Sequence, residues 1–334
     1  MSEYDIRAWR PGDEGSLLET YNLVFGAGDP AFRPRTLGEW EWAFQRNPAG
    51  SRVWLALRGE QVVAQYAALP YRTWVEGEER RFAQIVDSMV HPEHRDEAPG
   101  SGAEEPGLLV RTAERFFEAH GGRDRDLVHY GWPTEEAWRV GKAFLAYEVV
   151  RTQNFLVREL GAGAVEMPAA VEELERFDHE ARWVYDRCVG DWAASVIRDE
   201  VFLNWRFADH PRHDYTALGV RDGEGHLRGY AVFRVGDFLL PRVGMVLDWL
   251  VPPGEPEVGE LLLQAVSARA QSGGAAAVAV IFPEWSPWFE RFQDEGFLVY
   301  PSHYFMVARN FHRRYDMLWL RDHWWYQLAD TDLV

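Results

Sequence analysis

The sequence predicts an α+β protein with two tandem domains of one kind, each built around a mixed, mostly antiparallel sheet. Three observations predict this class. The length of 334 residues suits two domains better than a single core. A set of short motifs occurs twice in the same order. In each copy, segments with strand character are followed by amphipathic segments of helical period, so helices should pack on a sheet.

The repeat starts with the pattern W-x-F-x-x-x-P, which begins at Trp42 and again at Trp205. Farther along, Asp87 and Asp248 each stand five residues before a proline. An amphipathic stretch that ends in Gly-Gly follows in both copies. The matched order, rather than any one match, indicates a duplication. The other matched pairs are Tyr66 with Tyr230, Pro133 with Pro283 and Trp138 with Trp288.

The first copy contains an insertion that the second lacks. The matched positions are 161 residues apart at Asp87 and Asp248 but 150 apart at Pro133 and Pro283. About eleven extra residues therefore lie in the stretch EHRDEAPGSGAEEP, between a strand and a helix. Such a loop is a common place for a binding function to be added. The alternative is an expanded loop without a role.

The elements of the first copy follow from periodicity and from turn residues. Leu108, Thr112 and Phe116 fall on one helical face, and Gly121-Gly122 should end that helix. Thr134 has the side chain of an N-cap and should open the next helix. The expected strands are 4–9, 52–58, 62–75, 81–90, 127–131 and 147–156, the last of them closing the first copy, and a helix is expected over 14–25.

These elements and a change in composition predict the domain boundaries. The first domain should cover 1–158 and the degenerate second domain 177–311. The segment 159–176, rich in small and then acidic residues, reads as a linker. An aromatic-rich tail, 312–334, should pack back on the body.

Composition excludes several functions. A formal net charge of −18 disfavours nucleic acid and anionic lipid as partners. Cys188 is the only cysteine, so an intramolecular disulfide is impossible and a zinc cluster is not expected. No metal site is predicted. The sequence shows neither a signal core nor an apolar stretch of membrane-spanning length, which predicts a cytoplasmic protein. Nothing in it indicates an oligomeric state.

One motif resembles a known family. Val90-His91-Pro92-Glu93-His94-Arg95 looks like V-x-P-x-x-R, which ends the central strand of the GNAT N-acetyltransferase superfamily. The resemblance covers most of residues 4–157. It implies tandem GNAT-like domains and acetyl-CoA as the cosubstrate, without a metal. The cofactor-binding residues that it implies are Met89, Val90, Arg95, Gly100, Gly102, Gly107 and Leu108.

Physical chemistry agrees with this implied site. Small residues let backbone N–H groups approach a pyrophosphate, and the start of a helix adds positive potential. Splaying of the central strand would expose backbone groups near Met89 and Val90 to pantetheine amides. The loop R-D-E-A-P-G-S-G is two residues longer than the family pattern, and its acidic residues oppose phosphate. A second alignment, which starts the helix at Gly107, remains open. The second copy has Pro252 and Pro253 here, so only the first domain should bind the cofactor.

The residues that usually carry the family's chemistry are missing. Gln84 stands at the position of the family's general base, and Gly141 stands near the position of the tyrosine that acts as the general acid. The remaining catalytic candidates are Asp87, His129, Tyr130 and Tyr147. Each also has a structural interpretation. Asp87 has a counterpart in Asp248 and could tie strand to loop. His129 could be a core histidine, and Tyr147 could simply pack.

The resemblance implies an N-acetyltransferase that acts on the primary amine of a small acceptor, such as an amino sugar, an antibiotic or an amino acid. We expect the acceptor in the cleft where the two domains face each other, near Asp87, His129 and Tyr130. Two alternatives remain. One is a non-catalytic protein that binds CoA or another small molecule. The other is a Fem-type aminoacyl or acyl transferase, which should show a basic face or helical arm that the sequence lacks.

Overall fold

The computed structural model describes residues 3–95 and 106–333. The chain forms two compact units, and each unit combines segments that are distant in the sequence. Unit 1 consists of Met1–Arg72, Arg80–Val149 and Val307–Asp316, and unit 2 of Thr73–Glu79, Val150–Met306 and Met317–Val334. In the described residues, no helix combines the length and the apolar character needed to cross a bilayer.

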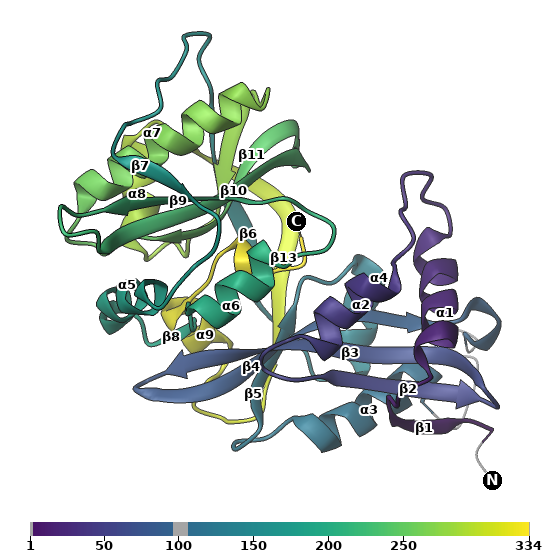
Figure 1. The fold of residues 1–334 in the computed structure, drawn as a ribbon. Coiled ribbons are helices and arrows are strands. Elements are labelled where there is room, and N and C mark those ends of the chain that lie inside the picture. The colour runs from purple at the N-terminus through teal and green to yellow at the C-terminus, as the bar shows by residue number, and fades with distance from the viewer. Residues whose placement is uncertain (1–2, 96–105, 334) are drawn as a thin grey trace. The chain divides into compact units, whose positions relative to one another are not determined.

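Unit 1 is a mixed sheet with helices packed on it (Figure 1). Its strand order is β1-β2-β3-β4-β5-β13, with β4 and β5 parallel and β1 antiparallel to β2. The helix α3 packs on β1 and β2. The elements are β1 (Asp5–Ala8), α1 (Glu14–Gly26), α2 (Leu37–Trp40), the π-helical turn η1 (Glu41–Gln45), β2 (Arg52–Arg58), β3 (Gln61–Val75), β4 (Glu78–Val90), the 3-10 turn η2 (Pro92–His94), α3 (Leu108–His120), β5 (Asp126–Gly131) and α4 (Glu135–Phe144).

Unit 2 repeats this plan. Its sheet order is β13-β6-β12-β11-β10-β9-β7, with β11 and β12 parallel, and α7 covers β9, β10 and β11. The elements are β6 (Glu148–Glu159), β7 (Val171–Leu174), α5 (Glu180–Cys188), η3 (Val189–Asp191), β8 (Ala194–Val196), α6 (Glu200–Leu203), the π-helical turn η4 (Asn204–Ala208), β9 (Thr216–Arg221), β10 (Leu227–Phe238), β11 (Leu240–Leu250), α7 (Pro256–Ser272), β12 (Ala277–Val280), α8 (Pro287–Asp294), β13 (Leu298–Asn310), α9 (Met317–His323), β14 (Trp324–Trp325) and η5 (Leu328–Asp330).

The duplication predicted from the sequence is confirmed at the level of fold. The two W-x-F segments adopt the same conformation, a four-residue α-helix that continues into a π-helical turn. The bounds of α2 and η1 differ from those of α6 and η4 by 163 residues throughout. Both helices start at a capping side chain, since Thr36 accepts from Glu39 N and Asp199 accepts from Phe202 N. The predicted α+β class with mixed sheets is therefore correct.

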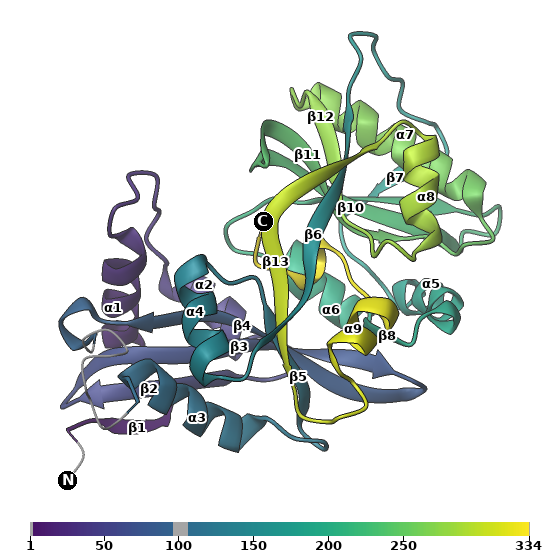
Figure 2. The same ribbon diagram turned by 180° about the vertical axis from the view of Figure 1, so that it is seen from behind.

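The last strand of each copy completes the sheet of the other unit. Residues 156–159 of β6 pair with 277–280 of β12, and Val307–Asn310 of β13 pair with β5 (Figure 2). The sequence predicts a strand at 147–156 correctly, but not this partner. Neighbouring strands in the sequence usually pair, and nothing in the local pattern of a strand specifies which edge it joins. The sequence-derived boundaries treat each domain as continuous, whereas both compact units are discontinuous.

Other local expectations are met. The helix α3 begins at Leu108 and ends before Gly121, as the apolar spacing indicates. Phe116 and Phe117 are buried on its inner face. Thr134 caps α4, accepting a hydrogen bond of 3.3 Å from Ala137 N.

The segment 159–176, expected to be a linker, contains a strand. This strand, β7, pairs with β9 at the edge of the unit 2 sheet.

Unit 1 should lose stability when the pH falls from about 6.5 toward 4. Burial, together with the nearby Arg52, lowers the pKa of His120 to about 4. Trp54 Nε1 donates to His120 Nε2 at 3.1 Å, a bond that requires the neutral ring. Below pH 6.5 the unfolded state binds a proton that the folded state does not, so folding becomes less favourable. Because the ring is partly exposed, we expect a loss on the order of 1–2 kcal/mol.

The measurement is urea unfolding at pH 7.5 and pH 5. A His120→Gln variant, whose amide oxygen can still accept from Trp54, should show a smaller loss between the two pH values. The control is His179→Asn, which changes an exposed histidine. Equal pH dependence in all three proteins would contradict the prediction.

Candidate functional site

The two parallel strands at the centre of unit 1 separate partway along their length. They pair from Arg81 opposite Asp126 to Gln84 opposite Tyr130. β4 then continues to Val90, whereas β5 ends at Gly131. Among the described residues, the edge of 85–90 that faces away from β3 has no strand partner. Its backbone N–H and C=O groups can bind a ligand that offers amides or carbonyls.

Asp87 lies within this separated stretch and has an unusual backbone. Its φ is 56°, in the left-handed region that Asp tolerates better than most residues with a Cβ. Gln65 Nε2 donates to Asp87 O at 3.0 Å and fixes this conformation. The Asp87 carboxylate forms an ion pair with Arg35, and the side chains are 11% and 22% exposed respectively. Such backbone outliers concentrate at functional sites.

The motif that follows β4 is held firmly in place. His91 N donates to Val63 O at 2.7 Å, which extends the pairing of β3 and β4 by one residue. The ring of His91 accepts from Glu93 N, and His94 Nδ1 lies 3.1 Å from the Tyr4 hydroxyl. Arg95 is exposed and makes a long hydrogen bond of 3.4 Å to Val90 O. The guanidinium of Arg95 therefore lies beside the end of β4.

The start of α3 lies against the end of β4. Leu108 is buried in a small cluster with which Val90 packs. Gly107 is the N-cap, and within the described residues no side chain caps the helix and no acidic residue stands in its first turn. Arg111 lies in the next turn, over the ring of Tyr4. These features suit an anion at the helix start. Gly100 and Gly102, also predicted to bind the cofactor, lie outside the described residues.

The equivalent place in unit 2 is unsuited to an anion. The N-cap of α7 is Glu255, followed by Pro256, which has no N–H to donate. Arg187 and Arg228 are both engaged by the Glu255 carboxylate. Trp288 fills the space beside the end of β11, and its indole donates to Val251 O at 3.2 Å.

The packing of this tryptophan is tight. A Cβ atom at Gly259 of α7 would lie 2.5 Å from the ring of Trp288, so the helix can approach only because this residue is glycine. Trp249 packs edge-on against the same ring, with 5.4 Å between ring centroids. Unit 2 thus keeps the strands and helix of the repeat, but aromatic side chains fill the space between the end of β11 and α7.

Comparison with known proteins supports the family resemblance that the sequence of the first copy indicates. Residues 5–99 match the model of the acetyltransferase (GNAT) domain. Residues 5–99 therefore have the sequence of a GNAT acetyltransferase domain. The match includes the V-x-P-x-x-R motif and all of β4. A sequence search of curated proteins finds no significant match.

Solved structures with the GNAT fold resemble nearly the whole chain. A GCN5-related N-acetyltransferase from Anabaena variabilis has a TM-score of 0.60 and 14% identity, with 92% of this chain and 73% of that chain covered. A probable N-acyltransferase from Enterococcus faecalis has a TM-score of 0.59 and 14% identity, with 96% and 74% covered. Saccharomyces cerevisiae N-myristoyltransferase with bound myristoyl-CoA has a TM-score of 0.57 and 13% identity, with 92% and 82% covered. At these identities the likeness shows a shared fold.

Two of the four predicted catalytic residues, His129 and Tyr130, lie on β5 of unit 1 and are fully buried. His129 is packed among the rings of Phe116, Phe117 and Phe311. Its Nε2 atom lies 3.5 Å from Asp126 Oδ2, and burial lowers its pKa. Tyr130 is equally inaccessible. Fully buried side chains cannot contact an acceptor, which favours the core interpretation of both.

Tyr147 is also committed to an internal contact. Its hydroxyl lies 2.9 Å from the hydroxyl of Tyr66, and both side chains are buried. Burial, reinforced by the neighbouring phenol, raises the pKa of Tyr147 well above its ordinary value. The residue is therefore a neutral structural partner of Tyr66. Among the four candidates, Asp87 is left as the one with partial solvent access.

The structure identifies two residues that the sequence reasoning missed. Arg35 pairs with Asp87, and Arg111 lies near the start of α3. Arg35 could have been found by extending the repeat toward the N-terminus, because Arg35-Thr36 aligns with Arg198-Asp199 at the same spacing of 163 residues. Arg111 carries no comparable signal, since a charged residue on a helix surface is common.

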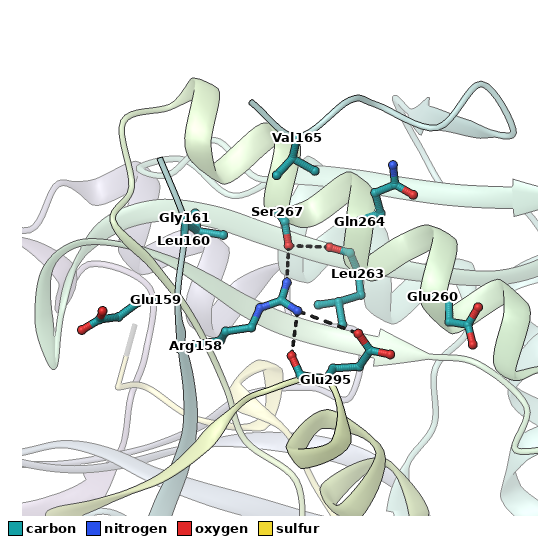
Figure 3. A pocket seen from close by; sticks show the side chains of 10 residues that line it. All are labelled: Arg158, Glu159, Leu160, Gly161, Val165, Glu260, Leu263, Gln264, Ser267 and Glu295. Atoms are coloured by element: carbon teal, nitrogen blue, oxygen red, sulfur yellow. Dashed lines mark hydrogen bonds and ion pairs between the residues drawn. The ribbon is translucent and has the colours of Figure 1, made fainter. Parts of the chain in front are cut away.

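A hollow of about 470 Å³ in unit 2 is lined by the end of β6, by α7 and by the C-terminus of α8 (Figure 3). Arg158 crosses it, donating to Ser267 Oγ at 2.8 Å and to Glu295 O at 2.9 Å. Glu159, Glu260 and Glu295 also line it. Three glutamates give the lining a net negative charge, and Nη1 and Nη2 of the one arginine are already hydrogen-bonded. This hollow therefore does not suit a phosphate-bearing cofactor.

Proposed function

We propose that the protein is an N-acetyltransferase that transfers an acetyl group from acetyl-CoA to the primary amine of a small acceptor. The observation that carries the proposal is the separation of β4 from β5 beside the uncapped start of α3. Backbone groups of 85–90 would bind the pantetheine amides, and Gly107, Leu108 and Arg95 would receive the pyrophosphate. Met89, which is buried, and Val90 contribute through their backbone.

In the proposed reaction the amine nitrogen attacks the thioester carbonyl carbon. The C–N bond forms, the C–S bond breaks, and the sulfur of CoA leaves as a thiolate that takes a proton. An amine is mostly protonated near neutral pH, so it must first lose a proton. Asp87, partly exposed on β4, would attract the ammonium group and accept its proton directly or through water. We assign Tyr147 no part in protonating the thiolate, because it is buried beside Tyr66.

The size of the acyl group is part of the same proposal. The fold is shared with a myristoyltransferase as well as with acetyltransferases. We favour acetyl because the family model that matches is an acetyltransferase domain. A comparison of acetyl-CoA with octanoyl-CoA and myristoyl-CoA as donors tests this choice.

The main alternative is a protein that binds CoA without catalysis. It is favoured by Gln84, which stands where the family usually has its base and is buried with its amide oxygen accepting from the Tyr71 hydroxyl. Turnover with acetyl-CoA and a panel of primary amines separates the alternatives. A protein that binds CoA and acetylates none of them is not an enzyme of this class.

Replacing Arg95 by alanine should weaken CoA binding by about 10- to 100-fold, because a charge-assisted hydrogen bond to phosphate is lost. Isothermal titration calorimetry with CoA measures this. The matched control is Arg228→Ala at the start of α7, which should leave CoA affinity unchanged. Weakening by the control alone would place the cofactor in unit 2 and contradict the proposal.

A further inference from the structure

The repeat places an arginine and an aspartate together twice. Arg35 and Arg198 both directly precede the N-cap of the short helix that leads into the π-helical turn. Arg35 forms an ion pair with Asp87 on β4, and Arg198 forms one with Asp248 on β11. The two sites are therefore copies of one arrangement, each contained within its own unit.

In unit 2 the arginine holds a second carboxylate. Arg198 Nη1 and Nη2 donate to the two carboxylate oxygens of Asp330, both at 2.8 Å, while Nε and Nη2 bind Asp248. Asp330 belongs to the C-terminal segment that includes η5, and all three side chains are fully buried. Arg206 secures this segment by donating to Ala329 O and Thr331 O. The arrangement thus accommodates two carboxylates on one guanidinium.

In unit 1 the same arginine has donors to spare. Arg35 contacts Asp87 through Nη1, and in the part of the chain that the structure describes neither Nε nor Nη2 of Arg35 makes a hydrogen bond. Its guanidinium carbon lies 4.1 Å from the centroid of the Tyr21 ring, a cation–π contact that helps to hold the group in place. The side chain is 22% exposed. A guanidinium that is held in place and has unused donors suits a carboxylate supplied from solution.

We infer that Arg35 binds the carboxylate of the acceptor, in the way that Arg198 binds Asp330, and that the acceptor is an amino carboxylate such as an α-amino acid. The two charges of such a molecule match the pair, because its carboxylate meets Arg35 and its ammonium group meets Asp87. The rest of the protein, at a net charge of −18, would repel an anionic group that lacked this local cation. The inference rests on the proposed acetyl transfer and specifies its substrate class.

The test uses matched probes: a panel of L-amino acids, their carboxamides and the corresponding decarboxylated amines, each assayed for acetyl transfer from acetyl-CoA. For the amino acid that is used best, we expect kcat/KM to exceed that of its carboxamide by about 10- to 100-fold. In Arg35→Met this preference should disappear, because activity toward the amino acid falls far more than activity toward the carboxamide. Arg35→Lys should retain part of it, as lysine supplies the charge without the planar fork.

The outcomes are distinguishable. Transfer to amines and carboxamides as fast as to amino acids by the wild-type protein overturns this inference and leaves the proposed function intact. The comparison needs no variant, so it stands even if Arg35→Met fails to fold. No transfer to any probe, with CoA binding absent in calorimetry, overturns the proposed function and this inference together.

Discussion

Replacing Arg198 by leucine is expected to destabilise unit 2 by on the order of 3–5 kcal/mol, the range for removing one partner of a buried ion pair. Arg198, Asp248 and Asp330 are all fully buried. Without the arginine, two carboxylates would remain in the interior with no cation. The C-terminal segment that carries Asp330 would also lose the two hydrogen bonds that Asp330 accepts from Arg198.

The matched control is Arg35→Leu, which removes the equivalent residue of unit 1. Arg35 and Asp87 are 22% and 11% exposed, so leaving Asp87 without its cation should cost clearly less than removing the cation from the fully buried trio. Urea unfolding followed by tryptophan fluorescence reports on both units, because Trp40 of unit 1 and Trp324 and Trp325 of unit 2 are all buried. Equal shifts of the unfolding midpoint in the two variants would show that the buried network is not a major source of stability.

A second substitution separates charge from size. With both carboxylates ionised, the trio carries one negative charge in excess, and burial raises the pKa of Asp248. Asp330→Asn keeps the shape of the side chain and removes the excess charge. It should therefore cost much less than Arg198→Leu, although the asparagine also loses charge-assisted hydrogen bonds. A loss as large as that of Arg198→Leu would contradict this electrostatic account.

The sequence was sufficient to predict the repeat and most of its elements. The two tryptophan motifs predict two like segments, and the structure gives both the same helix and π-helical turn. The start of α3 at Leu108 and the cap of α4 at Thr134 follow from apolar spacing and a short polar side chain. These signals are local, so they can be read without knowledge of the tertiary structure.

Strand partners could not be predicted in the same way. β6 has the apolar character of a strand, but it lies between β13 and β12 in the sheet and does not pair with β5. An isolated strand offers hydrogen-bonding edges to any sheet, and tertiary packing decides which sheet it joins. A discontinuous unit of this kind leaves no mark in composition or periodicity.

The candidate site was predictable only in part. The V-x-P-x-x-R motif indicated where β4 separates from β5, the backbone feature on which the proposed cofactor site depends. Residue type alone could not show that His129 is enclosed by phenylalanines, or that Tyr147 is bonded to Tyr66. Apolar alternation is the same for a core histidine and for one at the wall of a pocket. Asp87 differs because its strand departs from regular geometry, which sequence patterns do not record.

Replacing Asp87 by asparagine should lower the rate of acetyl transfer by at least about tenfold. Loss of a general base usually lowers a rate by about 100- to 10,000-fold. Asparagine is nearly isosteric and also tolerates the left-handed backbone. It can still accept a hydrogen bond from Arg35, so folding should be preserved to within about 1 kcal/mol. It has no negative charge to attract an ammonium group, and it cannot accept the proton of the amine.

The kinetic measurement is kcat with acetyl-CoA and the best acceptor. CoA affinity, measured by calorimetry, should not change, because the substitution keeps the backbone of 85–90 and does not alter the residues assigned to the pyrophosphate. The control is Asp248→Asn, the repeat counterpart in unit 2. That aspartate is fully buried beneath Arg198, so its substitution should alter the unfolding midpoint while the folded protein keeps its kcat. Full activity in Asp87→Asn would remove this carboxylate from the mechanism. Unfolding of Asp87→Asn would instead show that the ion pair with Arg35 ties β4 to the start of α2. The kinetic role requires a folded variant that binds CoA normally and fails only in acetyl transfer.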